Sequence, residues 1–318
     1  MKLPTAPARP ALERAAGRAR DFIAAAKSPQ TIRAYRSDWR HFAAWCETAG
    51  ISPLPAAPET VAMYLADLAG THRPSTLARR LAAIGKAHGA AGFESPAKLG
   101  HAAVGETMNG IRRVKGTAPS VKTPLLTDDI RRIVACLPPT LAGARDRAIL
   151  LLGFAGGFRR SELAALDAAD LAFTAEGLII EIRFSKTDPL GRGRKTAIPA
   201  GSGETCPVTA VRDWMSRAPV AAGPLFRAVD RRGRAAAKRL HRDSIGAIVK
   251  RSAAAAGLDP SQYAGHSLRS GLATQAYLNG ASELAIMRQT GHKSMAMVRR
   301  YIRDGSLFRD NPASKLGL

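Results

Sequence analysis

The second half of the chain carries a set of arginine, histidine, lysine and tyrosine residues that could act on a phosphate. Phosphoryl transfer without a metal needs cationic donors around the phosphate, an attacking oxygen and a proton source for the leaving oxygen. The sequence contains no GxxxxGK loop, no HExxH motif, no clustered His and Cys and no acidic cluster suited to Mg²⁺. These side chains therefore favour chemistry that uses neither a metal nor a cofactor.

These side chains lie in five short sequence elements that follow one another along the chain. They are residues 157–163 (GFRRSEL, with Arg159), Lys186 in an expected hairpin turn, residues 266–269 (HSLR, with His266 and Arg269), Gly291-His292, and Tyr301, nine residues after His292. Each element alone is common, and each has a plain structural alternative such as a surface arginine or a buried histidine. The order and spacing of all five together are specific.

Some assignments within this set have competitors. Arg160 stands beside Arg159, and the Ser-Glu-Leu that follows favours Arg159. Lys195, at the far side of the expected hairpin turn, competes with Lys186. Tyr263 and Tyr277 lie near the HSLR element, but only Tyr301 has the spacing from His292.

At this point the sequence resembles the tyrosine recombinase (phage integrase) family. That family's pattern is an Arg in a G-x-R-x-S-E-L turn, a hairpin Lys, H-x-x-R, L/T-G-H and a Tyr about nine residues later. The resemblance covers the catalytic half and extends more weakly to residues 28–35 (SPQTIRAY). It implies a mainly α fold with a small antiparallel β-sheet in the C-terminal domain. It also implies an all-helical N-terminal core-binding (SAM-like) domain, the two domains forming a DNA clamp.

The resemblance also implies a role for each residue. Tyr301 would attack the scissile phosphate and form a 3′-phosphotyrosyl bond, while Arg159 and Arg269 hold the non-bridging oxygens. His292 would add a donor in the transition state, and Lys186 would protonate the departing 5′ oxygen. His266 would assist proton removal from Tyr301, since a free tyrosine hydroxyl is mostly protonated at pH 7. One diester replaces another, so the reaction needs no ATP.

Composition agrees with a nucleic-acid partner. The 318 residues carry a formal net charge of +23, and both halves of the chain are basic, which indicates a polyanion contacted by both. An Arg-rich composition from a GC-rich genome would give the same imbalance. The hydrophobic fraction of 46% predicts a folded chain. Cys46, Cys136 and Cys206 are expected to be buried and reduced, and no apolar run suits a membrane span, so we expect a cytoplasmic protein.

The pattern along the chain predicts four parts. Residues 1–10 form a flexible arm, 11–115 a helical DNA-binding domain, 116–124 a linker and 125–318 the catalytic domain with a tail over 302–318. Helices are expected over 31–48, 59–69, 75–89, 105–114, 145–154, 161–166 and 207–217, with Thr127 as the cap of another and four or five more after Arg239. Strands are expected over 177–184, 196–199 and 225–226. Gly271 stands inside an expected helix, where glycine is unfavourable.

Three functions are compatible with these residues. A site-specific recombinase that acts on double-stranded DNA fits these residues best. We expect it to be a homotetramer on DNA and a monomer or weak oligomer without DNA. The alternatives are a type IB topoisomerase and a DNA-binding module on a decayed recombinase scaffold. A helical N-terminal domain favours recombination, and the complete set of catalytic side chains disfavours decay. The tail could dock in cis or in trans. Candidate DNA contacts, which a solvated charged face would equally explain, are Arg33, Arg36, Arg40, Arg79 and Arg80.

Overall fold

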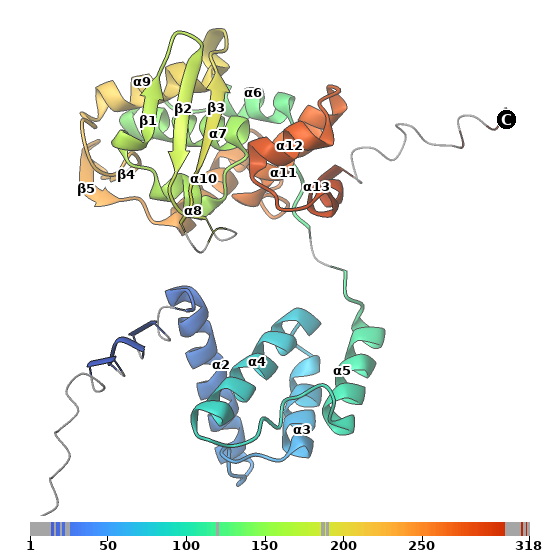
Figure 1. The fold of residues 1–318 in the computed structure, drawn as a ribbon. Coiled ribbons are helices and arrows are strands. Elements are labelled where there is room, and N and C mark those ends of the chain that lie inside the picture. Colours follow the sequence, from blue (N-terminus) through green and yellow to red (C-terminus); the bar gives the residue numbers. More distant parts are fainter. Residues whose placement is uncertain are drawn as a thin grey trace, which may run out of the picture. The chain divides into compact units, whose positions relative to one another are not determined.

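The structure is a computed structural model that describes residues 26–118, 121–185, 188 and 191–302, with residues 14–15, 17–19, 21–22, 313 and 316. The expected arm at 1–10 and nearly all of the tail lie outside the described residues. The chain divides into two compact units, Met1–Ser120 and Val121–Leu318 (Figure 1). Among the described residues, no helix has the length and apolar character needed to cross a membrane.

The first unit is helical, as predicted. Its helices are α2 (Pro29–Thr48), α3 (Pro58–Ala69), α4 (Pro74–Ala90) and α5 (Ala102–Lys115). Ser28 caps α2 by accepting a hydrogen bond from the backbone of Thr31, and a proline occupies the first turn, which fixes the start of the helix. Phe42 and Cys46 of α2 are fully buried in an apolar cluster with residues of α3, α4 and α5. This cluster forms the core of the first unit.

The second unit contains the small antiparallel sheet that the resemblance implied. Strands β1 (Leu171–Phe173), β2 (Gly177–Ile182) and β3 (Arg194–Pro199) pair in chain order. One face of β2 and β3 is buried, and helices α7 (Leu141–Gly156) and α9 (Pro207–Arg217) pack against each other and against β3. A second ribbon joins β4 (Arg227–Val229) and β5 (Ala235–Arg239). It was missed because β5, with the sequence AAAKR, lacks the β-branched and aromatic residues that mark strands.

The remaining helices of this unit include those that carry or adjoin the candidate catalytic side chains. They are α6 (Thr127–Ala135), α8 (Arg160–Ala165), α10 (Arg242–Ala255), α11 (His266–Leu278), α12 (Glu283–Thr290) and α13 (Met295–Ile302). Helices α11, α12 and α13 contact one another around a small apolar cluster that includes Ala273, Ile286, Val298 and Ile302. This cluster fixes the segment that holds Tyr301.

Three local expectations were wrong. Thr127 is the first residue of α6 rather than its cap; the backbone N–H of Leu126 donates to the Asp129 carboxylate instead. Leu225 and Phe226 are fully buried but lie before β4 rather than in a strand. Cys136 is exposed, whereas Cys46 and Cys206 are buried as expected.

Gly271 has a clear packing reason for its place inside α11. A Cβ at this position would lie 1.9 Å from the backbone oxygen of Leu125, so the helix touches the segment that enters the second unit. The Leu125 N–H donates to the Ser267 oxygen on the same helix, at 3.1 Å. Glycine is therefore needed for the close approach of two backbones.

We expect Gly271→Ala to lower the free energy of unfolding by about 1–3 kcal/mol, the usual cost of overpacking. Urea unfolding measures the change. Gly246→Ala is the matched control, because this helical glycine in the same unit has only ordinary contacts, the nearest at 3.5 Å. Equal stability of the two variants would contradict the packing argument.

Candidate active site

The GFRRSEL element forms a tight connection between two helices. Helix α7 ends at Gly156, and Arg159 is the residue that precedes α8. The Glu162 carboxylate accepts one hydrogen bond from the Arg159 backbone at 3.0 Å and another from the Arg159 guanidinium at 2.5 Å. Burial raises the pKa of Glu162, but the hydrogen bonds and charge of Arg159 outweigh it, so the net pKa lies below its usual range. Glu162 therefore holds the Arg159 side chain in place as a charged carboxylate.

Arg269 lies on α11 and is almost fully buried, with 1% of its surface exposed. Its Nη1 donates to the backbone oxygens of Gly157 and Thr290, each at 2.6 Å, and so ties α11 to two other elements of the predicted set. Its Nη2 is buried and has no hydrogen-bond partner among the described residues. Burial, with the charge of Arg159 next, lowers the pKa of Arg269 to about 10, so the guanidinium remains charged at pH 7.

His292 follows the turn at Gly291, whose φ of 66° is left-handed and suits glycine. The Thr290 hydroxyl donates to the Ile286 oxygen at 2.6 Å, and it lies 2.7 Å from His292 Nδ1. Because the hydroxyl proton is already used, Nδ1 is the donor to Thr290, and Nε2 carries the lone pair of the neutral ring. That Nε2 atom is buried without a partner in the described part of the chain. Burial, followed by the charges of Arg269 and Arg159, lowers the pKa of His292 to about 3.

The low pKa of His292 predicts a pH-dependent stability. Between about pH 6.5 and pH 3 the unfolded chain binds a proton at this histidine that the folded chain does not bind. The free energy of unfolding should therefore fall as the pH drops from 7 to 5, and less steeply in His292→Gln. Denaturant unfolding at the two pH values measures this, and identical slopes for both proteins would contradict the assignment.

Tyr301 lies on α13 between two histidines. Its ring centroid is 5.3 Å from that of His266 and 5.2 Å from that of His292. The Thr274 hydroxyl donates to the Tyr301 backbone oxygen at 2.9 Å, which fixes α13 against α11. Desolvation, followed by the charges of Arg269 and Arg159, lowers the pKa of His266, the first residue of α11. The structure thus brings Arg159, His266, Arg269, His292 and Tyr301 of one chain together.

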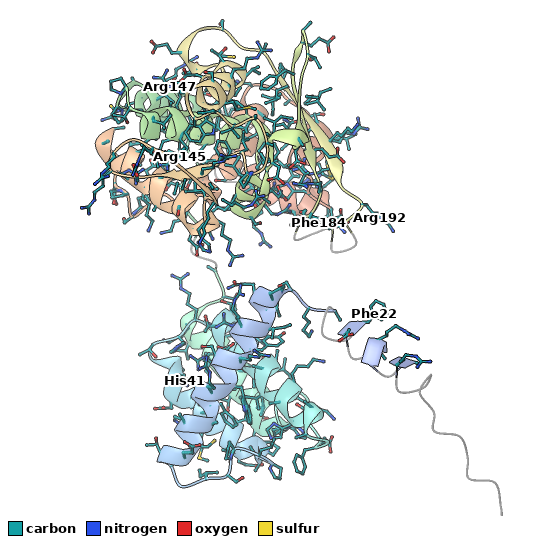
Figure 2. The ribbon with its side chains drawn as sticks, turned by 90° about the vertical axis from the view of Figure 1, so that its left-hand side faces the viewer. Phe22, His41, Arg145, Arg147, Phe184 and Arg192 are labelled. Carbon is teal, nitrogen blue, oxygen red and sulfur yellow. The ribbon has the colours of Figure 1, made fainter. Side chains whose placement is uncertain are left out.

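The second element, the expected hairpin turn with Lys186, lies only partly within the described residues. Lys186 lies outside the described residues, and the flanking Phe184 and Arg192 are labelled in Figure 2. Ser185, next to Lys186, accepts from Arg159 at 3.0 Å and donates to Glu162 at 2.8 Å, so the chain enters the turn beside Arg159. Lys195 is exposed, and the alternation of β3 places it on the opposite face from Arg194 and Thr196.

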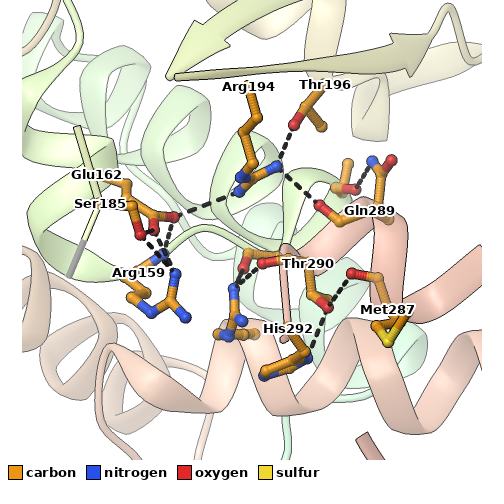
Figure 3. Close-up of polar contacts among 12 residues, drawn as sticks. Arg159, Glu162, Ser185, Arg194, Thr196, Met287, Gln289, Thr290 and His292 are labelled. Atoms are coloured by element: carbon orange, nitrogen blue, oxygen red, sulfur yellow. Dashed lines mark hydrogen bonds and ion pairs between the residues drawn. The ribbon is translucent and has the colours of Figure 1, made fainter. Parts of the chain in front are cut away.

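Two site residues were not recognised from the sequence. Glu162 was noted only as part of a motif, although its carboxylate holds Arg159. Arg194, which donates to Gln289 and pairs with Glu162 at 3.5 Å, was not singled out (Figure 3). Nothing in the local sequence distinguishes Arg194 from the other basic residues, since its partners come from distant segments.

The candidate DNA contacts in the first unit fall into two groups. Arg33, Arg36 and Arg40 are exposed along α2. Arg79, half exposed, pairs with the buried Asp38 at 2.9 Å. Arg80 is buried, and its guanidinium donates to the Tyr64 hydroxyl and contacts His72. Arg80 therefore serves the interior of this unit.

Comparison with known proteins now places the chain. Residues 124–306 match the model described as "Phage integrase family", and residues 21–91 match "Phage integrase, N-terminal SAM-like domain". An "Integrase/recombinase xerD homolog" from Selenomonas ruminantium is 42% identical over 309 residues, which cover 96% of this chain and 90% of that protein. The chain belongs to the phage integrase family. It is a tyrosine-type site-specific DNA recombinase.

Other relatives agree with this family assignment. A "Tyrosine recombinase XerD" from Xanthomonas axonopodis pv. citri is 29% identical over 280 residues, with 86% of each chain covered. Among solved structures, XerH recombinase bound to its difH substrate aligns with a TM-score of 0.59 at 17% identity, covering 83% of this chain and 73% of that one. A lambda integrase tetramer bound to a Holliday junction aligns at 0.58 and 16%, covering 92% and 78%. These structural likenesses support the two-domain recombinase fold.

Proposed function

We propose that this recombinase cleaves and rejoins double-stranded DNA through a covalent 3′-phosphotyrosyl bond to Tyr301. One observation carries the proposal. Arg269 Nη2 and His292 Nε2 are buried polar atoms without partners among the described residues, and both belong to side chains grouped with Tyr301. Buried polar atoms without partners are uncommon in folded proteins. A phosphate at this point would give the Arg269 donor an acceptor.

The reaction follows from the proposed roles. The Tyr301 oxygen attacks phosphorus while His266 assists removal of its proton, and the bond from phosphorus to the 5′ oxygen breaks. Lys186 protonates that 5′ oxygen. Arg159 and Arg269 hold the non-bridging oxygens, because a guanidinium offers a rigid fork of donors. His292 is neutral in the free protein, and the negative phosphate favours protonation at Nε2, which then donates.

Cleavage leaves the charge of the phosphate and the number of its ester bonds unchanged. A phosphodiester of DNA becomes a diester between DNA and Tyr301, so the bond energy is retained for rejoining. The same steps in reverse, with a 5′ hydroxyl from another strand, complete the exchange. We propose that this proceeds without metal or ATP.

We also propose that Arg33, Arg36, Arg40 and Arg79 contact the duplex and that both basic units bind it as a clamp. We propose that the protein acts in the cytoplasm. By analogy with the lambda integrase tetramer, we propose a homotetramer in the complex that exchanges strands, formed from a monomer or weak oligomer. If the clamp makes about 6–10 phosphate contacts, affinity should fall about 10³–10⁵-fold between 50 and 200 mM salt. Fluorescence anisotropy with labelled duplex measures this slope, and a flat response would contradict the clamp.

Covalent trapping tests the proposal. A bound sequence is first selected from a random duplex library and then prepared with a nick near the cleavage point, so that the released fragment diffuses away. Protein and nicked duplex are mixed in EDTA without ATP and separated on a denaturing gel. We expect a protein–DNA adduct. Tight binding to the selected sequence without an adduct would favour a binding module. If the protein forms the adduct and relaxes a supercoiled plasmid that carries the sequence, but exchanges no strands between two duplexes, a topoisomerase is favoured.

A further inference from the structure

Arg194, the first residue of β3, reaches from the hairpin into the candidate active site. Its Nη1 donates to the backbone oxygen of Gln289 at 3.1 Å and to the Thr196 hydroxyl (Figure 3). Its Nη2 lies 3.5 Å from Glu162 Oε2. One side chain therefore connects the hairpin, the GFRRSEL element and the end of α12.

Packing holds the guanidinium in this position. It lies over the Phe158 ring, 5.8 Å from the centroid, and its side chain is 21% exposed. A Cβ at Gly291 would lie 2.7 Å from Arg194 Nε, so Arg194 occupies the space beside the turn that leads to His292. Gly291 thus suits both its left-handed backbone and the close approach of Arg194.

The charges explain what this contact does. Glu162 lies between two guanidinium groups, Arg159 at 2.5 Å and Arg194 at 3.5 Å. Burial lowers the pKa of Arg194, and Glu162 partly offsets that effect. Without Arg194, the carboxylate would have Arg159 as its only ion-pair partner among the described residues, and its negative charge would be less neutralised beside a bound phosphate.

We propose that Arg194 is a positioning residue for strand cleavage. It acts through Glu162 and the Gln289 carbonyl, which its Nη2 and Nη1 contact. It aligns three parts of the site: Arg159 through Glu162, His292 through the Gln289–Gly291 turn, and the paired strands β2 and β3. The proposal rests on the reaction proposed above.

Two substitutions measure the effect under single-turnover conditions with saturating protein. Arg194→Gln should slow adduct formation by about 10–100-fold, by analogy with the loss of hydrogen-bond partners of metal-ligating residues. Arg194→Lys should fall between Arg194→Gln and the wild type, because an ammonium lacks the planar fork that reaches two partners. The DNA dissociation constant should change less than about twofold. Arg192→Gln, an exposed hairpin arginine, is the control for loss of charge and should leave the rate unchanged.

A double-mutant cycle separates positioning from a purely structural contribution. In a Glu162→Gln background, Arg194→Gln should cost less than a third of its effect in the wild type, since its partner carboxylate is gone. Circular dichroism melting checks that each variant is folded at the assay temperature. A rate within twofold of wild type in Arg194→Gln, or an undiminished penalty in the Glu162→Gln background, would overturn the proposal. Absence of any adduct with wild-type protein would instead refute the proposed reaction.

Discussion

Tyr301→Phe is expected to abolish covalent adduct formation while leaving DNA affinity within about twofold. The variant removes only the attacking oxygen, and the ring that lies between His266 and His292 stays in place. The loss should exceed about 10⁴-fold, comparable to removing a member of a catalytic triad. Single-turnover cleavage of the nicked duplex and anisotropy measure the two quantities.

The matched controls for this prediction are the two tyrosines nearest the HSLR element in sequence. Tyr263→Phe and Tyr277→Phe remove one hydroxyl each from the same unit and should retain the adduct. If Tyr301→Phe still forms an adduct and one of these does not, the nucleophile has been assigned wrongly.

Arg269→Lys is expected to slow cleavage by about 10²–10³-fold, the usual cost of losing one preorganised donor at a developing charge. The guanidinium holds the Gly157 and Thr290 carbonyls with Nη1, and its Nη2, which has no hydrogen-bond partner among the described residues, is the donor that we propose for a phosphate oxygen. An ammonium at the end of a lysine cannot occupy both positions at once. Cleavage rates at saturating protein measure the effect.

Arg160→Lys is the control for this prediction. This substitution also replaces a guanidinium with an ammonium, but in the GFRRSEL element. Arg160 is half exposed, and its ion pair with Asp243 measures 3.4 Å. Its rate should remain within about threefold of wild type. Equal losses in the two variants would show that general basicity, rather than the Arg269 fork, determines the rate.

The order of chemistry-bearing residues was readable from the sequence because the side chains that act on a phosphate come from a short list of types. Arg159, His266, Arg269, His292 and Tyr301 were named from their order and spacing and from the family pattern that these resemble, and the structure brings them together. Their roles stay predictions. Lys186 also stays a prediction, because it lies outside the described residues.

The supporting contacts could not be read in the same way. Arg194 and Glu162 are 32 positions apart, and Arg194 and Gln289 are 95 apart. Arg80 looked like its neighbour Arg79, yet it turns inward to Tyr64 because of its place on the helix. Local patterns give the period of a helix, whereas these pairings depend on how distant segments pack.

The attachment site of the trapped DNA tests the central claim most directly. The adduct from a nicked duplex would be digested with nuclease and trypsin, and the modified peptide sequenced by mass spectrometry, with label on either side of the cleaved bond to identify the DNA end. The account predicts a single modified residue, Tyr301, joined to the 3′ phosphate. DNA attached to another residue, or through a 5′ phosphate, would contradict it.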